Sequence, residues 1–250
     1  MADEVLSVAE AMDAQYLLRR SLSEPNADVA QRQHLVDALF ADRLSKPTLD
    51  LLRDAAGDDW QSSDALASGI RDAAVTLAWR AAVDDKSVEP ARAQVLALIA
   101  AVKSNLSVST ALADPARDVA DRESLALSLV KGASDVVGLL TRSALTDQRG
   151  VFAANLSAYL DALAALRGRQ RAAVVSAVAL TTNQTTTLIT QLSRIFGSEI
   201  DLEPTVDPGV IGGIRVDVGG DVIDGSIKAR LDAARQAMSQ ITLKKDEEND

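Results

Sequence analysis

Residues 206–227 of the chain read VDPGVIGGIRVDVGGDVIDGSI, and this stretch decides the fold of the C-terminal part. Apolar residues recur with a spacing of two from Val210 to Val218, which is typical of a half-buried strand. Gly219-Gly220 then supplies the two positive-φ positions that a two-residue hairpin turn needs. The stretch therefore predicts a strand, a tight turn and a short partner strand at 221–224, and Gly225-Ser226 opens a terminal helix.

The same residues resemble the C-terminal signature of the delta subunit of F-type ATP synthases, whose mitochondrial counterpart is the oligomycin-sensitivity-conferring protein. The family pattern runs from Val-Asp-Pro through Gly-Gly, alternating apolar residues and Val-Gly to Asp-Gly-Ser. The matching positions are Val206, Asp207, Pro208, Ile211, Gly212, Gly213, Ile214, Val216, Val218, Gly219, Val222, Ile223, Asp224, Gly225 and Ser226. Leu231 and the strand-like segment 175–180 with Thr181 also look like the family. The order of these matches makes the resemblance specific.

Composition limits the classes of protein that the chain can belong to. The formal net charge of −10 argues against nucleic acid or an anionic membrane surface as the main partner. The chain has no cysteine, so disulfides and thiolate metal sites are excluded. No apolar run approaches the ~20 residues that span a bilayer, and no signal-peptide pattern is present, so we expect a soluble protein without direct membrane insertion.

The first two-thirds of the chain is predicted to be all-helical. Apolar residues recur there every three to four positions, as on the buried face of an amphipathic helix. The stripes comprise Val5, Val8, Met12 and Tyr16; Leu35, Leu39 and Phe40; Ile70, Ala74, Leu77, Ala78 and Ala81; Val95, Leu98, Ile99, Val102 and Leu106; and Phe152, Leu156, Tyr159, Leu160 and Leu163. Pro25, Pro47, Pro90 and Pro115 fall between the stripes, where proline starts helices.

An internal sequence repeat indicates that this helical part is duplicated. The segment LSEP at 22–25 aligns with LADP at 112–115, and DVAQR at 28–32 aligns with DVADR at 118–122. After a slip of two residues, Leu51-Leu52 meets Leu139-Leu140. We therefore expect a first helical copy at 1–85, a second at 86–168, an α/β module at 169–242 and a disordered tail at 243–250. The family member with one helical bundle is shorter, and the elongated form is similar to delta subunits of high-GC Gram-positive bacteria.

The C-terminal module reads as strand, helix, strand and hairpin. Residues 174–180 form the first predicted strand, and Thr181 with Gln184 has the form of a helix capping box. Leu188, Leu192, Ile195 and Phe196 mark the buried face of the helix, and Gly197 is placed to end it in the left-handed conformation. Ile200 and Leu202 start the next strand. A last helix carries Ile227, Leu231 and Met238. The predicted fold is a duplicated all-α bundle followed by a small α/β module.

No catalytic, cofactor-binding or metal-binding residue is predicted. His34 is the only histidine and has no acid, nucleophile or second ligand near it in the sequence. Asp207, Asp217, Asp221 and Asp224 could be read as a cation site, but turn capping and solvation explain them better. The Gly219–Gly225 spacing fits neither the dinucleotide fingerprint nor the P-loop. Trp60 and Trp79 are expected in the core, and Arg167, Arg169 and Arg171 in a solvated hinge.

The resemblance implies a non-catalytic structural connector. It places the chain in the stator of an ATP synthase, at the cytoplasmic face of a bacterial cell membrane. It implies that the helical bundle grips N-terminal helices of the alpha subunits and that the C-terminal module meets b-type subunits of the peripheral stalk. Neither a small-molecule substrate nor nucleic acid is implied. Two alternatives stay open from the residues alone: a free-standing helical-repeat adaptor, and a small enzyme with an α/β substrate module.

Overall fold

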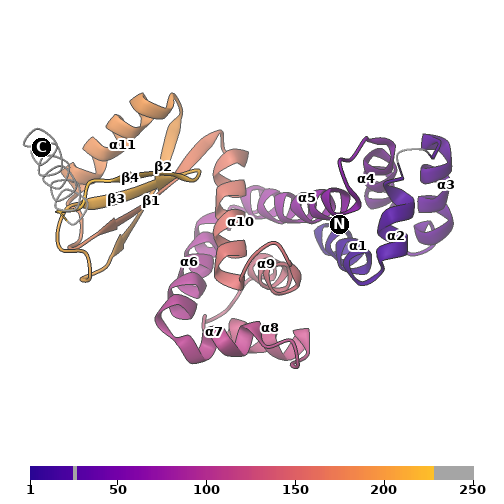
Figure 1. Cartoon of the computed structure of the whole chain (residues 1–250), viewed down its shortest axis with the longest axis horizontal. Helices are drawn as coiled ribbons and strands as arrows, with labels where there is room; N and C mark the ends of the chain where they lie inside the picture. Colours follow the sequence, from indigo (N-terminus) through magenta and orange to yellow (C-terminus); the bar gives the residue numbers. More distant parts are fainter. Residues whose placement is uncertain (25–26, 228–250) are drawn as a thin grey trace, which may run out of the picture. The chain divides into compact units, whose positions relative to one another are not determined.

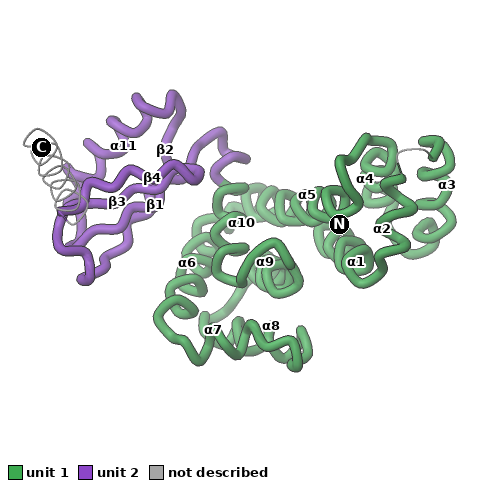
Figure 2. Tube along the Cα trace, viewed as in Figure 1, with its two compact units in different colours: residues 1–163 green, residues 164–250 purple. Residues whose placement is uncertain are grey.

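The structure is a computed structural model that describes residues 1–24 and 27–227. The chain divides into two compact units, Met1–Leu163 and a second that begins at Ala164 (Figure 2). Pro25, the predicted last helix beyond Ile227 and the predicted tail at 243–250 lie outside the described residues.

The first unit is all-helical, as predicted (Figure 1). Its helices are α1 (Ala2–Ala14), α2 (Tyr16–Leu22), α3 (Val29–Phe40), α4 (Lys46–Gly57), α5 (Ser63–Asp84), α6 (Val88–Ser104), α7 (Leu106–Ala113), α8 (Val119–Ser128), α9 (Asp135–Thr146) and α10 (Phe152–Leu166). Side chains that accept hydrogen bonds from backbone N–H groups start several of them, since the first turn of a helix leaves these donors unpaired. Asp28 caps α3, Ser62 caps α5 and Asn105 caps α7.

The 22-residue helix α5 contributes buried residues to two hydrophobic cores of the first unit, one at each end of the helix. Its first half, with Leu66, Ile70 and Ala74 buried, packs in a cluster with α1 to α4. In its second half Trp79 is fully buried and donates its indole N–H to the Tyr159 carbonyl of α10 at 2.8 Å. The prediction that Trp79 lies in the core is confirmed, and Trp60 packs partly buried against the first cluster.

Four residues of the predicted buried stripes are in fact exposed: Tyr16, Leu39, Ala81 and Leu106. Leu106 is exposed because α6 ends at Ser104 and Leu106 starts α7 instead of continuing the α6 stripe. The ring of Tyr16 is 56% exposed, because extended Gln15 ends α1 and Tyr16 starts α2 instead of continuing the α1 stripe. Leu39, near the end of α3, is 40% exposed, and the residues of α3 that are buried are Arg32 and Val36.

No single helix among the described residues is long and apolar enough to cross a bilayer. Helices α6 and α7 would meet the criteria of length and composition together, but the chain bends by 105° between them.

The second unit is a four-stranded mixed sheet with one described helix on it. Its elements are β1 (Arg169–Ser176), α11 (Thr182–Phe196), β2 (Glu199–Val206), β3 (Ile214–Val218) and β4 (Asp221–Asp224). The strand order is β2-β1-β3-β4, with β1 parallel to β2 and antiparallel to β3, and β3 antiparallel to β4. The core between sheet and helix contains Ala172, Val174, Val216, Val218 and, from α11, Leu192.

The local signals in this unit are confirmed. Thr181 and Gln184 form a complete capping box, and Gly197 ends α11 with a φ of 68°. Gly219 and Gly220, at φ values of 59° and 94°, make the two-residue turn between β3 and β4. This turn type needs two positive-φ residues, so the glycine pair fixes the register of the hairpin.

The first strand was predicted too late in the sequence. It runs from Arg169 to Ser176 and not from Val174 to Leu180. Its first residues are polar, but Arg169 pairs with Glu199 at 3.1 Å and Arg171 with Glu203 at 2.7 Å across the parallel neighbour β2. These cross-strand ion pairs take the place of an apolar pattern. The hinge expected at this arginine cluster is therefore wrong for Arg169 and Arg171, which lie in β1.

Candidate partner-binding surface

The residues weighed as chemical candidates serve structural roles where the structure describes them. Asp207 accepts a hydrogen bond from the Gly209 N–H at 2.8 Å, and Asp224 from that of Ser226 at 2.9 Å. Asp217 does the same for Gly220 at 3.1 Å, inside the hairpin. His34 is exposed on α3. Within residues 1–24 and 27–227, no three His, Cys, Asp or Glu side chains are grouped so that they could hold a metal ion.

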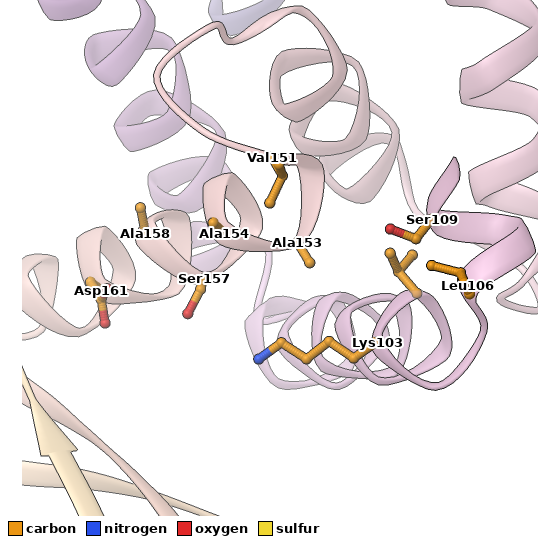
Figure 3. Close-up of a pocket in the computed structure, with 10 residues that line it drawn as sticks. Lys103, Leu106, Ser109, Val151, Ala153, Ala154, Ser157, Ala158 and Asp161 are labelled. Carbon is orange, nitrogen blue, oxygen red and sulfur yellow. The ribbon is translucent and has the colours of Figure 1, made fainter. Parts of the chain in front are cut away.

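An open groove of the first unit runs along α10. We call it the α6–α10 groove; it has a volume of about 600 Å³. It is lined by Val102, Lys103, Leu106, Ser109, Val151, Ala153, Ala154, Ser157, Ala158 and Asp161. Figure 3 shows that the residues from Val151 to Asp161 follow α10, while Lys103, Leu106 and Ser109 come from the corner between α6 and α7.

The groove is apolar although it faces solvent. The side chain of Leu106 is 82% exposed and that of Val151 is 71% exposed. Both lie where a helix begins, Leu106 at the first residue of α7 and Val151 just before α10. Removing such side chains from water stabilises a complex by roughly 25 cal/mol per Å² of apolar surface. An apolar groove beside a helix is suited to the apolar face of another helix.

A second groove lies on the other side of α10. This α5–α10 groove, of about 480 Å³, includes Val75 and Thr76 of α5 together with Ala162 of α10. It shares Ala154 and Ala158 with the α6–α10 groove. These two alanines are exposed and form a low ridge between the grooves, and small side chains at such positions let another backbone approach closely.

The loop between α9 and α10 borders these grooves and is fixed by charge. Arg149 bridges two carboxylates, Asp147 at 2.8 Å and Asp72 of α5 at 2.7 Å. Burial alone would raise the pKa of Asp147, but hydrogen bonds from Arg149 and Tyr159 hold that pKa below its ordinary value. Burial raises the pKa of the Tyr159 hydroxyl, which contacts both Asp147 and Ser143.

Buried amides and guanidinium groups complete the support of this loop. The Asn155 side-chain amide donates to the carbonyls of Ala144, Asp147 and Gly150 at 3.0, 2.9 and 3.0 Å. Arg71 of α5 is 2% exposed, and it pairs with Asp13 and donates to Thr146 at 2.9 Å.

One further arginine ties α9 to α1. Arg142 pairs with Glu10 at 2.6 Å and with Asp3 at 3.1 Å, and the hydrogen bond to Glu10 raises the pKa of the guanidinium.

The sequence did not predict the grooves along α10 or the ion pairs beside them. The ion pairs join residues that are far apart in the chain, such as Asp72 and Arg149, so no local spacing reveals them. A weak signal was present in α10, where three of the four exposed positions, Ala154, Ala158 and Ala165, are alanine and only Asp161 is a charged residue of the kind expected on a solvated face.

Comparison with known proteins assigns the family. The family model described as ATP synthase delta (OSCP) subunit matches residues 76–238. The chain belongs to the ATP synthase delta (OSCP) subunit family. The match begins inside α5, so α1 to α4 precede it.

Three proteins named ATP synthase subunit delta are similar over nearly the whole chain. The Cutibacterium acnes protein is 33% identical, over 95% of this chain and 90% of its own length. The Frankia casuarinae protein is 32% identical, over 95% and 87%. The Streptomyces avermitilis protein is 33% identical, over 96% and 88%. All three come from actinobacteria, so the resemblance to an elongated actinobacterial delta subunit is confirmed.

Family membership decides between the functional classes considered above. The chain is a non-catalytic subunit of a rotary F-type ATP synthase. The adaptor and enzyme alternatives do not account for relatives that match almost end to end.

Proposed function

We propose that this chain is the stator connector that joins the peripheral stalk to the catalytic head of the ATP synthase. The helical unit receives N-terminal helices of the alpha subunits, and the C-terminal module contacts b-type stalk subunits. The complex then holds the chain peripherally at the cytoplasmic face of the bacterial cell membrane. The chain performs no chemistry and resists the torque of the rotor, so that proton flow is coupled to ATP synthesis.

The observation that carries the proposal is the open apolar α6–α10 groove on a rigid helical unit. An exposed leucine and an exposed valine at its rim would be covered by a helical partner. The buried network around Arg71, Arg149 and Asn155 holds the groove wall in place before any partner arrives. A preformed site loses less conformational entropy on binding than a mobile one.

The C-terminal unit offers apolar side chains of its own for the stalk. Ile211 and Val178 are each 72% exposed, and Ile195 on α11 is 66% exposed. Ile195 was predicted on the buried face of α11, and its exposure makes it available to a partner. These side chains support the assignment of the stalk contact to this unit.

A charged residue on the α10 ridge tests the connector role. Ala158→Glu would bury a carboxylate against an apolar partner face, so we expect at least about a tenfold loss of affinity for enzyme depleted of this subunit. Ala97→Glu is the matched control, because Ala97 is an exposed alanine of α6 that does not line the groove. The measurement is rebinding of the full chain to depleted membranes, together with ATP-driven proton pumping.

Two results would refute the connector role. One is recovery of the chain free of every ATP synthase subunit from mildly solubilised membranes in which the rest of the enzyme stays intact. The other is normal proton pumping by membranes from which the chain has been removed.

We also propose that residues 1–85 and 86–168 are two copies of one five-helix unit. The helix bounds support this: α2 begins at Tyr16 and α7 at Leu106, 90 residues later, and α5 begins at Ser63 and α10 at Phe152, 89 later. Arg32 and Arg122 lie at equivalent positions; Arg32 donates to the Glu24 carbonyl, two residues after α2, and Arg122 donates to the Leu112 carbonyl in the last turn of α7. The Nε atoms of both arginines are buried without a hydrogen-bond partner.

A further inference from the structure

Helix α1 has an apolar face and a polar face that contact different parts of the helical unit. The apolar face is buried in the first core and comprises Val5, Leu6, Val8, Ala9 and Met12. The polar face carries Asp3, Ser7 and Glu10, whose spacing of four and then three residues places them on one side of the helix. This polar face contacts α9, which belongs to the second copy, residues 86–168.

A single arginine of α9 binds all three side chains of the polar face. Arg142 donates to Glu10 from Nε at 2.9 Å and from Nη2 at 2.6 Å. It also donates from Nη1 to Asp3 at 3.1 Å and from Nη2 to Ser7 at 3.0 Å. The guanidinium can bind them together because its donors form a rigid planar fork. We call Arg142 with Asp3, Ser7 and Glu10 the Arg142 clasp.

Few other contacts join α1 to α4 of the first copy with the second copy. Thr146 of α9 donates to Glu10 at 3.4 Å. In the described part of the chain, Leu139 of α9 is the one apolar residue from beyond α5 that packs against the first core. Arg71 and Asp72, which bind α9 and the α9–α10 loop, belong to α5, the helix that contributes to both cores. The joint between α1 and the second copy is therefore mainly ionic.

Arg142 balances an excess of negative charge at this joint. Burial raises the pKa of Glu123 on α8, Arg142 opposes the rise, and the charges of Glu10 and Asp3 add to it. Glu123 therefore lies within range of the same charges as the clasp. Without Arg142, these three carboxylates would face one another across the joint, and like charges repel.

The clasp is specific to the contact between the copies and is not a general feature of the repeated unit. The positions of α6 that correspond to the polar face of α1, 90 residues later, are exposed alanines: Ala93, Ala97 and Ala100. With the offset of 88 that aligns Leu51-Leu52 with Leu139-Leu140, Arg142 corresponds to Asp54 in the first copy. Helices of this bundle thus form without the polar face and without the arginine.

The clasp is accessible to salt, whereas the two cores are apolar. The side chains of Arg142 and Glu10 are 28% and 23% exposed, and that of Asp3 is 71% exposed. Attraction between partly exposed charges weakens as the Debye length falls from ~30 Å in ~0.01 M salt to ~3 Å in ~1 M salt. Burial of apolar surface does not depend on this attraction, so the cores keep their packing.

We propose that the Arg142 clasp holds the two copies at one angle, and that it opens at high ionic strength while both cores stay folded. With the clasp closed, α1 and α9 are joined beside α5. With the clasp open, α5 is the main connection between the copies, and the angle between them varies. This opening needs no partner subunit, so a test on the isolated full-length chain is independent of the connector role.

Distances between two spin labels test the opening. The chain has no cysteine, so His34→Cys on α3 and Ser124→Cys on α8 place one label at an exposed residue of each copy. The doubly labelled full-length chain is measured by double electron–electron resonance in sodium chloride. We expect a narrow distance distribution in ~0.01 M salt and a distribution about twice as wide in ~1 M salt.

Variants of two arginines assign the effect to the clasp. Arg142→Gln should give the wide distribution already in low salt, and Arg142→Lys an intermediate one, because lysine keeps the charge but lacks the fork. Arg53→Gln is the matched control. Arg53 also bridges two carboxylates, Asp37 at 2.6 Å and Asp50 at 2.8 Å, but both lie within the first copy. This control should keep the narrow distribution.

Hydrogen exchange separates opening of the clasp from unfolding. We expect the amides of α4 and α10 to exchange as slowly in Arg142→Gln as in the wild-type chain. Faster exchange throughout both helices would show that the cores unfold, and the proposal would be overturned. It would also be overturned by a narrow distribution in Arg142→Gln or in high salt, by a wide one for the wild-type chain in low salt, or by equal broadening in Arg53→Gln.

Discussion

Removal of the Asn155 side chain should destabilise the helical unit. It is 5% exposed, and its amide donates to the carbonyls of Ala144, Asp147 and Gly150. Asn155→Ala removes two N–H donors and leaves buried carbonyls unpaired, at about 1–3 kcal/mol for each donor lost. Alanine recovers about 0.5 kcal/mol through its higher helix propensity. We expect the free energy of unfolding to fall by about 1.5–5.5 kcal/mol.

Urea unfolding followed by tryptophan fluorescence measures this loss directly. Both tryptophans, Trp60 and Trp79, lie in the first unit, so the signal reports the helical unit alone. Asn183→Ala is the control, because Asn183 is exposed on α11 in the second unit and should leave the fluorescence transition unchanged. A loss below about 1 kcal/mol for Asn155→Ala would show that the carbonyls find other partners, and the reasoning would be refuted.

Three other changes have defined outcomes. Gly213→Ala should speed hydrogen exchange in β3 far more than Gly219→Ala, because a Cβ at Gly213 would clash with the backbone oxygen of Gly225, while a Cβ at Gly219 meets nothing within 4 Å. Equal exchange in the two variants would contradict this. Hydrogen bonds hold the pKa of Asp147 below its ordinary 3.8 against the opposite effect of burial, so its stabilisation is present above about pH 4 and lost as pH falls through the folded pKa. Asp147→Asn should therefore flatten the acid limb of a plot of unfolding free energy against pH, and an unchanged limb would count against the assignment. Arg142→Ala should cost about 1–2 kcal/mol in urea unfolding, less at high salt, because it breaks the ion pair with Glu10; salt-independent loss would point to packing instead.

Local chemistry in the second unit could be predicted from the sequence because each signal acts over a few residues. The capping box at Thr181, the αL glycine at Gly197 and the Gly219-Gly220 turn are each fixed by backbone geometry that few residues satisfy. The start of β1 could not be predicted in this way. Its first residues are stabilised by carboxylates of β2, and the sequence of β1 alone does not indicate that these carboxylates lie beside it.

The helical part shows the same division between local and distant effects. The buried stripe of α1 from Val5 to Met12 follows from helical periodicity, and Tyr16 departs from it because a single extended residue restarts the helix. The groove along α10 depends on which helices meet, and periodicity does not contain that information. The contacts between the two halves of the helical unit depend on Arg71 and Arg149, each of which binds a residue from the other half.

The length of α5 fixes the rotational phase of the two helical copies. One continuous helix of 22 residues serves both cores, so any residue inserted between Arg71 and Trp79 would turn one core against the other by about 100° and shift it by about 1.5 Å. Arg71 would then point away from its partners in α9, and Asp72 from Arg149 in the α9–α10 loop. Substitutions on the exposed surface of α5 are therefore tolerated, but an insertion or deletion between the two cores is not.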